Sequence, residues 1–219
     1  LAQALGRADR AGLAVMIHAV GDRANRELVA LFEALEENRR HTGAPAPMVP
    51  HRIEHVQMIR PADAERLRRL PLALCLTPAN MLLDMNLIDH AVGEKGRWAY
   101  DFRRLVDTGA PVMFSSDCPV CDPAPLLGMH AAVTRRRTDG SPEKGWHPES
   151  RVTMREALAA YTEIPAAVHR MPEVGAVAPG RRADLAILSQ DILESPDVWL
   201  PDVTVDMTLF DGCIVHRSF

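Results

Sequence analysis

The sequence predicts an α/β fold in which helices flank a parallel β-sheet. Three short, almost continuously apolar runs and one further strand end, at residues 52–55, occur along the chain, and helical spacing of apolar residues marks the segments between and after them. Continuous apolar runs are typical of strands buried on both faces, as in parallel sheets. Because four strand–helix units make half of an eight-stranded barrel, we expect half of a TIM (β/α)8 barrel.

Two strand–helix units occupy the start of the chain. Residues 13–18 form the first predicted strand, which ends at His18, and residues 22–40 form its helix. Residues 52–55 form the end of the second strand, after a Pro-rich linker that cannot be helical. We expect the second helix over residues 61–69, since a proline at its start suits the first helical turn.

Two more units follow. Residues 72–76 form the third strand and residues 111–114 the fourth, which leads into Asp117. Their helices are predicted over residues 98–107 and 125–136. The sequence therefore places a polar, chemically competent residue just beyond the fourth strand.

The pattern changes after these units. A capping box, Thr153 with Glu156, opens a helix, and residues 183–188 and 203–209 read as strands. The dipeptide at 211–212, Asp-Gly, is a strong hairpin signal and predicts a returning strand. We expect a small antiparallel sheet, and divide the chain into an α/β unit over residues 1–170 and a β unit over residues 171–219.

Composition excludes several classes of protein. The chain has 219 residues, is 47% hydrophobic and carries a net charge of −4, which argues against a nucleic-acid partner. It has no apolar run of about 18 residues that could cross a membrane. Four scattered cysteines make no disulfide framework, so we expect a reducing cytoplasm. The chain begins without Met inside a predicted helix, so we expect an N-terminal part to precede Leu1.

Three predicted strands end at a residue that can bind metal or transfer protons: His18, His55 and Asp117. In a parallel barrel the carboxyl ends of the strands face one mouth, so these side chains can converge. Imidazole nitrogens and a carboxylate suit a cation such as zinc, which lowers the pKa of bound water to about 7. Asp117 could act as the general base. Taken singly, each histidine could instead be structural, and Asp117 could cap a turn.

Three segments resemble signature segments of the amidohydrolase superfamily: residues 18–22 (HAVGD), 51–55 (HRIEH) and 115–119 (SSDCP). They look most like the branch known as YtcJ-like or amidohydrolase family 3, which includes N-substituted formamide deformylases. Further matches follow in family order and extend the resemblance over nearly the whole chain. They lie at residues 132–135, 156–162, 180–188 and 211–212.

The resemblance implies a distorted TIM barrel with a small β-sandwich built from both chain ends. Residues 1–170 then correspond to barrel strands 5–8, and residues 171–219 to the C-terminal part of the sandwich. His18 and His55 match the metal ligands after the fifth and sixth strands, and Asp117 matches the eighth-strand ligand and general base. The implied activity is hydrolysis of an amide or related non-peptide C–N bond of a small molecule, with one or two divalent ions, most often zinc.

The chain departs from the family in one large respect. The family's first strand carries an H-x-H metal-binding pair, and no H-x-H occurs here. The fourth-strand Lys or Glu that often bridges two metals also has no counterpart, and both would lie upstream of Leu1. An open half barrel leaves two unpaired strand edges. We therefore expect self-association or pairing with the missing N-terminal half, and keep a non-catalytic binding or assembly module as the alternative function.

Three further features each carry two interpretations. Residues 79–97 form either a substrate-binding loop or lid at the barrel mouth, or a short helix packing Met and Leu against the barrel. Trp146 either lines the substrate pocket or anchors its loop. Cys118 and Cys121 form a CxxC, which could serve thiol–disulfide redox chemistry or simply be two small, partly buried thiols.

Overall fold

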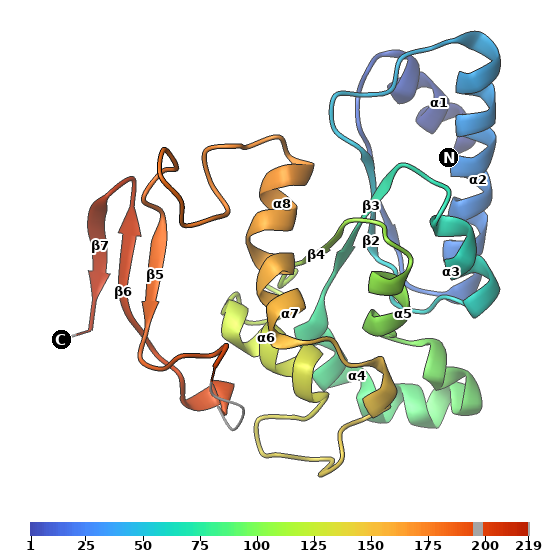
Figure 1. Ribbon diagram of the computed structural model, residues 1–219. Helices are drawn as coiled ribbons and strands as arrows, with labels where there is room; N and C mark the ends of the chain where they lie inside the picture. Colours follow the sequence, from blue (N-terminus) through green and yellow to red (C-terminus); the bar gives the residue numbers. More distant parts are fainter. Residues whose placement is uncertain (195–198, 219) are drawn as a thin grey trace.

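A computed structural model describes residues 1–194 and 199–218 (Figure 1). Its centre is a four-stranded parallel sheet with the strands in chain order, β1-β2-β3-β4. The strands are β1 (Met16–Ala19), β2 (His51–His55), β3 (Leu72–Leu76) and β4 (Val112–Phe114). The predicted α/β fold with a parallel sheet is therefore confirmed.

The first strand differs from its prediction. Strand β1 begins at Met16 rather than at residue 13, and Leu13 is 61% exposed. All five residues of β3 are buried, as expected for a strand covered on both faces, but Met16 on β1 is 66% exposed. The reason is position: β1 pairs only with β2 and lies at the edge of the sheet. An apolar run predicts a strand without revealing whether a neighbour covers it.

Helices lie on both sides of this sheet. The described helices of four residues or more, apart from one 3-10 segment, are α1 (Ala2–Arg10), α2 (Asp22–Thr42), α3 (Pro61–Leu67), α4 (Pro78–Val92), α5 (Phe102–Asp107), α6 (Pro125–Thr134), α7 (Met154–Tyr161) and α8 (Glu163–Val168). Figure 1 shows α2, α3 and α5 on one side of the sheet and α8 on the other.

Alternate residues of the strands meet these two layers. Ile53 and Leu74 belong to the main core, which the apolar face of α2 joins. On the opposite face Ala73, Cys75 and Met113 pack against Val168 and Ile164 of α8. Alternation along the strands thus explains how a fully apolar strand such as β3 is buried on both sides.

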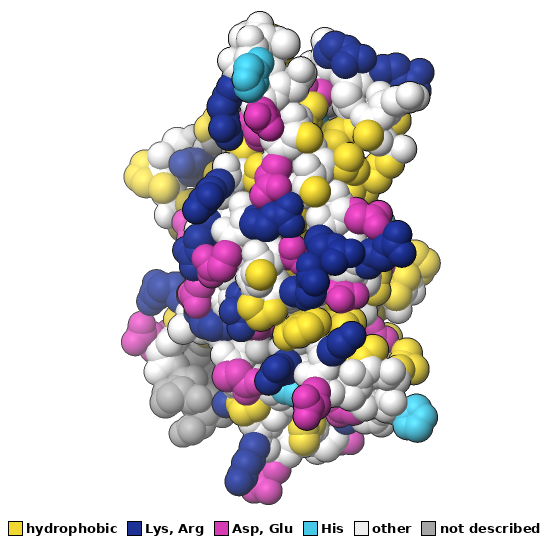
Figure 2. All heavy atoms as spheres, turned by 90° about the vertical axis from the view of Figure 1, so that its right-hand side faces the viewer, with side chains coloured by type: hydrophobic (Ala, Val, Ile, Leu, Met, Phe, Trp, Pro, Cys, Tyr) yellow, Lys and Arg dark blue, Asp and Glu magenta, His cyan; other side chains and the backbone are white. Residues whose placement is uncertain are grey.

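The outer surface of α2 and α3 is charged rather than apolar. Figure 2 shows this side of the molecule, with basic and acidic side chains interspersed. Arg66 on α3 pairs with Glu33 on α2 at 2.6 Å and with Asp63 of its own helix at 2.8 Å. Opposite charges that alternate in this way suit a solvated face, so these helices turn their apolar sides to the sheet.

Residues 79–97 are mostly helical, which decides between their two predicted structures. Helix α4 begins directly after β3, and a 3-10 turn over Gly93–Trp98 follows it. Met81 and Met85 are fully buried, as the helical alternative requires. The next helix, α5, begins at Phe102, later than predicted, because the Asp101 carboxylate caps it by accepting from the Arg104 backbone N–H.

A second, antiparallel sheet follows, with strand order β5-β6-β7. Its strands are β5 (Leu185–Leu188), β6 (Val205–Phe210) and β7 (Cys213–Arg217). Asp211 and Gly212 both have positive φ, 51° and 78°, as the predicted two-residue hairpin requires. The small antiparallel sheet is confirmed. All residues of β7 are exposed, so this sheet carries little core of its own.

None of the helices in the described part of the chain is both long and apolar enough to cross a membrane.

Candidate metal centre

The carboxyl ends of the parallel strands bring the predicted site residues to one edge of the sheet. His18 is the last residue but one of β1, and His55 ends β2. In the β1–β2 register His18 lies opposite Glu54 and Ala19 opposite His55, so the two histidines are diagonal neighbours. Their ring centroids are 4.4 Å apart, edge to face.

Asp117 lies near these two histidines although it follows the strand farthest from β1 in the sheet. It lies in the loop that follows β4, and its Oδ2 is 4.0 Å from His55 Nε2. The Asp117 side chain is 41% exposed, whereas that of His55 is 9% exposed. The structure therefore brings the three residues together around His55, although 99 positions separate the first from the last (117 − 18).

The backbone is strained where two of these residues lie. His55 has φ 70° and Asp117 has φ 56°, and Val56 has φ 44°. L-residues rarely adopt this region, and for a β-branched residue such as Val56 it is especially unfavourable. Each such residue costs about 1–3 kcal/mol, and strain of this kind persists where the surroundings impose it, often at functional sites.

The surroundings of His55 favour its neutral form. Burial, and then the nearby His18, lower the pKa of His55, while the Asp117 carboxylate opposes the shift. A neutral imidazole can offer a nitrogen lone pair to a cation, whereas a protonated one cannot. The environment thus favours a His55 ring with a free nitrogen lone pair.

Thr77 is a partner of His55 that sequence reasoning missed. It occupies the N-cap position of α4, yet its side chain makes no capping hydrogen bond. Its Oγ1 lies instead 3.3 Å from His55 Nδ1. Metal-binding histidines generally donate their second ring N–H to such an acceptor, which fixes the tautomer and the ring orientation. Its only signal in the sequence was a threonine at the end of a predicted strand.

The donor set suits a divalent cation, but the three residues do not enclose one by themselves. Two imidazoles and a carboxylate are zinc ligands, and ligand atoms around a tetrahedral zinc lie about 3.3 Å apart. The 4.0 Å between His55 Nε2 and Asp117 Oδ2 needs only a small adjustment. Within residues 1–194 and 199–218, however, no three His, Cys, Asp or Glu side chains are already arranged to hold an ion.

Trp146 does not stand free in a pocket. It is 7% exposed, its Nε1 donates to Asp89 of α4 at 2.9 Å, and the Arg135 guanidinium lies 5.2 Å from its ring. These contacts favour the loop-anchoring interpretation. The substrate-binding role of Trp146 stays a prediction.

The cysteines of the CxxC are free, with Cys118 exposed and Cys121 half-buried. The Cys121 thiol donates to the Asn80 side chain on α4. Burial, and then the Asp117 carboxylate and other acidic neighbours, raise the pKa of Cys121. A raised pKa disfavours the thiolate that redox chemistry needs, so these contacts favour the structural interpretation.

Comparison with known proteins identifies the family of this chain. The model of the amidohydrolase family matches residues 1–216. The chain belongs to the amidohydrolase family. Within it, the chain is 27% identical to the putative amidohydrolase YtcJ of Bacillus subtilis, across 100% of this chain and 40% of that protein. The predicted YtcJ-like resemblance is confirmed.

Two further relatives match most of this chain. The chain is 31% identical to the protein LONG AFTER FAR-RED 3 of Arabidopsis thaliana, across 83% of this chain and 30% of that one. It is 28% identical to an N-substituted formamide deformylase of Arthrobacter pascens, across 96% of this chain and 38% of that enzyme. The chain thus spans well under half the length of these relatives.

Solved structures show the same fold. A metal-dependent hydrolase of Pyrococcus furiosus aligns with a TM-score of 0.66 at 29% identity, covering 83% of this chain and 34% of that one. Atrazine chlorohydrolase TrzN of Arthrobacter aurescens, in complex with zinc, aligns with a TM-score of 0.54 at 16% identity, covering 99% and 46%. The mixed α/β fold with a parallel sheet is therefore that of metal-dependent hydrolases.

Proposed function

We propose that this chain contributes His18, His55 and Asp117 to the metal centre of a hydrolase that cleaves an amide or related C–N bond of a small molecule. The observation that carries the proposal is the convergence of three residues that lie far apart in the sequence. The ring centroids of His18 and His55 are 4.4 Å apart, and His55 Nε2 is 4.0 Å from Asp117 Oδ2. The left-handed backbone at His55 and Asp117 supports the proposal, because strained backbone conformations concentrate at functional sites.

Each residue has a separate role in this proposal. His18 and His55 would hold a divalent cation through ring nitrogens, and Asp117 would do so through a carboxylate oxygen. The cation supplies a Lewis acid that polarises a carbonyl and lowers the pKa of water to about 7. Asp117 Oδ2 takes a proton from the attacking water and returns it to the leaving nitrogen. Thr77 Oγ1 accepts from His55 Nδ1 and keeps Nε2 directed at Asp117.

The relatives support the class of reaction and of cofactor. One relative is named a deformylase of N-substituted formamides, and a structural neighbour was solved with zinc. We therefore propose zinc, as one or two ions, and an amide-like substrate. We also propose that β1 to β4 are strands 5–8 of a TIM barrel over residues 1–170, with residues 171–219 part of a β-sandwich. The missing ligands and strand partners would then come from an N-terminal half or a second copy.

The decisive test is made on the full-length protein that contains this chain. Asp117→Asn removes the proton acceptor and should lower hydrolysis of a panel of N-substituted formamides and amides about 10²–10⁴-fold. Asp122→Asn is the matched control, since Asp122 lies in the same loop and accepts from the Ala124 N–H. Its activity should stay within about twofold of the wild type, because this contact is local and exposed.

Two results would contradict the proposal. One is activity that survives Asp117→Asn or a chelator, and the other is a full-length protein that binds no zinc, iron or manganese. The second would favour the non-catalytic binding or assembly module, which the absence of an H-x-H pair from the sequence also motivates.

A further inference from the structure

We propose that Asp84 of α4 is a positioning residue for His55: its carboxylate joins Gln57 to Tyr100 and so holds the strained backbone that follows β2. The inference rests on the proposed function, because it assigns Asp84 to the support of one proposed metal ligand. It concerns the three-residue group Asp84, Gln57 and Tyr100, called the Asp84 clamp below.

The clamp is a closed set of hydrogen bonds. The Tyr100 hydroxyl donates to Asp84 Oδ2 at 2.6 Å, and Gln57 Nε2 donates to the same oxygen at 2.8 Å. The Tyr100 backbone N–H in turn donates to the Gln57 carbonyl at 2.7 Å. Gln57, 27 positions before Asp84, and Tyr100, 16 positions after it, therefore meet at one carboxylate oxygen.

The clamp is shielded from water, which strengthens it. Tyr100 is 2% exposed, and Asp84 and Gln57 are half-buried. Burial, and then the Asp84 carboxylate, raise the pKa of Tyr100, so its hydroxyl remains a protonated donor. Hydrogen bonds to a charged acceptor are stronger than those between neutral groups, so two of them can offset the strain at a left-handed residue.

The position of Gln57 connects the clamp to the site. Gln57 lies two residues after His55. The two residues that precede Gln57, His55 and Val56, have φ 70° and 44°. Without restraint the chain would relax to ordinary φ and turn the His55 ring away from Asp117. On its other side Met58 N–H donates to the Val20 carbonyl at 2.9 Å, which ties the segment to the end of β1. The segment is thus held from two directions.

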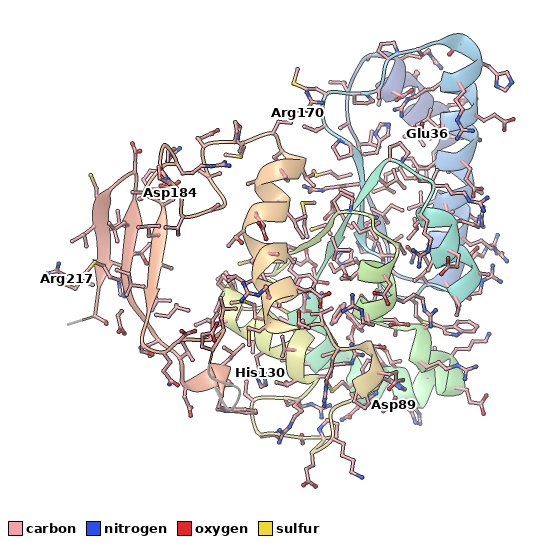
Figure 3. All side chains as sticks on the ribbon, viewed as in Figure 1. Glu36, Asp89, His130, Arg170, Asp184 and Arg217 are labelled. Carbon is pink, nitrogen blue, oxygen red and sulfur yellow. The ribbon has the colours of Figure 1, made fainter. Side chains whose placement is uncertain are left out.

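Helix α4 therefore supports His55 twice. Thr77 at its start contacts the ring, and Asp84 further along holds the backbone that follows. If Asp84 only stabilised the fold, its substitution would have the same effects as substitution of another residue of α4 that makes a hydrogen bond. Asp89, labelled in Figure 3, provides that comparison, because it accepts from the buried Trp146 indole at 2.9 Å.

The test compares alanine variants of these two aspartates in the full-length protein. Asp84→Ala should weaken Zn²⁺ affinity about 10–100-fold, the usual effect of removing a group that orients a ligand. It should also speed hydrogen exchange at the Gln57 and Met58 amides. Asp89→Ala should lower thermal stability but keep the Zn²⁺ dissociation constant within about twofold. Asp84→Asn should recover most of the affinity, because an amide oxygen can accept from both donors.

Each other outcome counts against the clamp or against the proposed function. Unchanged Zn²⁺ affinity in folded Asp84→Ala, or equal losses in Asp84→Ala and Asp89→Ala, would overturn the inference. If Asp84→Ala does not fold, Tyr100→Phe removes one donor at constant shape, and unchanged affinity there has the same meaning. If the wild type binds no Zn²⁺, the proposed function fails. Hydrogen exchange then tests the clamp separately. Equal amide exchange rates at Gln57 and Met58 in Asp84→Ala and in the wild type would refute it.

Discussion

Two of the threonines at N-cap positions in the described part of this chain, Thr77 and Thr153, have different roles in the structure. Thr153 forms a complete capping box with Glu156 at the start of α7. Thr77 makes no cap at the start of α4, and its hydroxyl lies against His55 Nδ1 at 3.3 Å. Substituting each threonine by the nearly isosteric valine therefore separates helix stability from support of the proposed metal ligand.

The expected magnitudes follow from these contacts. Thr153→Val loses a cap and should reduce the free energy of unfolding by about 1 kcal/mol, with Zn²⁺ affinity unchanged. Thr77→Val loses no cap, but it leaves His55 Nδ1 without an acceptor at a site where Thr77 is 3% exposed. Its Zn²⁺ affinity should fall about 10–100-fold, which is about 1.4–2.8 kcal/mol.

The assay is a Zn²⁺ competition titration of the full-length protein, paired with urea unfolding of the metal-free form. Thr77→Ser is the matched control, since it keeps the hydroxyl and should bind Zn²⁺ within about threefold of the wild type. The reasoning is refuted if Thr77→Val binds Zn²⁺ as the wild type does, or if Thr153→Val loses as much affinity as Thr77→Val.

Two predictions concern stability away from the site. Burial lowers the pKa of His51. Burial raises the pKa of Asp9, but the hydrogen bonds and charges of Arg39 and His51 together outweigh it, so the net shift of Asp9 is also downward. Both folded-state pKa values lie below their unfolded values, so stability should fall as pH drops, first below about 6.5 and again below about 4. Urea unfolding from pH 8 to 3 checks this, and a stability that rises on acidification would contradict it. Gly128→Ala would drive a methyl into the Tyr161 hydroxyl and should cost about 1–3 kcal/mol; Gly128→Ala made in a Tyr161→Phe background should cost less, and an equal cost there would refute the clash.

The sequence was sufficient to predict the parallel sheet and the convergence at its edge. Carboxyl ends of parallel strands share one side, so any polar residue that ends a buried run becomes a candidate for the same site. The order of His18, His55 and Asp117 along the chain therefore carried geometric information. The prediction needed only the carboxyl ends of the strands, and these were correct to within one residue even where β1 began later than expected.

The supporting contacts were beyond sequence reasoning for a physical reason. Asp84 meets Gln57 and Tyr100 through side chains whose pairing depends on how α4 packs on the sheet, and no local pattern encodes that packing. Thr77 followed by proline reads only as the end of a strand. Helix α4 itself was ambiguous, because Met81 and Met85 could equally have lined a loop.

The strand order of the sheet has a consequence for assembly. His18 belongs to the first strand of the sheet, His55 to the second and Asp117 to the loop after the last. A sheet in which β1 or β4 has not yet paired cannot bring His18, His55 and Asp117 together. A cation bound there would favour only the fully assembled sheet, by about 2.7 kcal/mol at a hundredfold excess over its dissociation constant. Occupancy of the site would thus report that the last strand has joined.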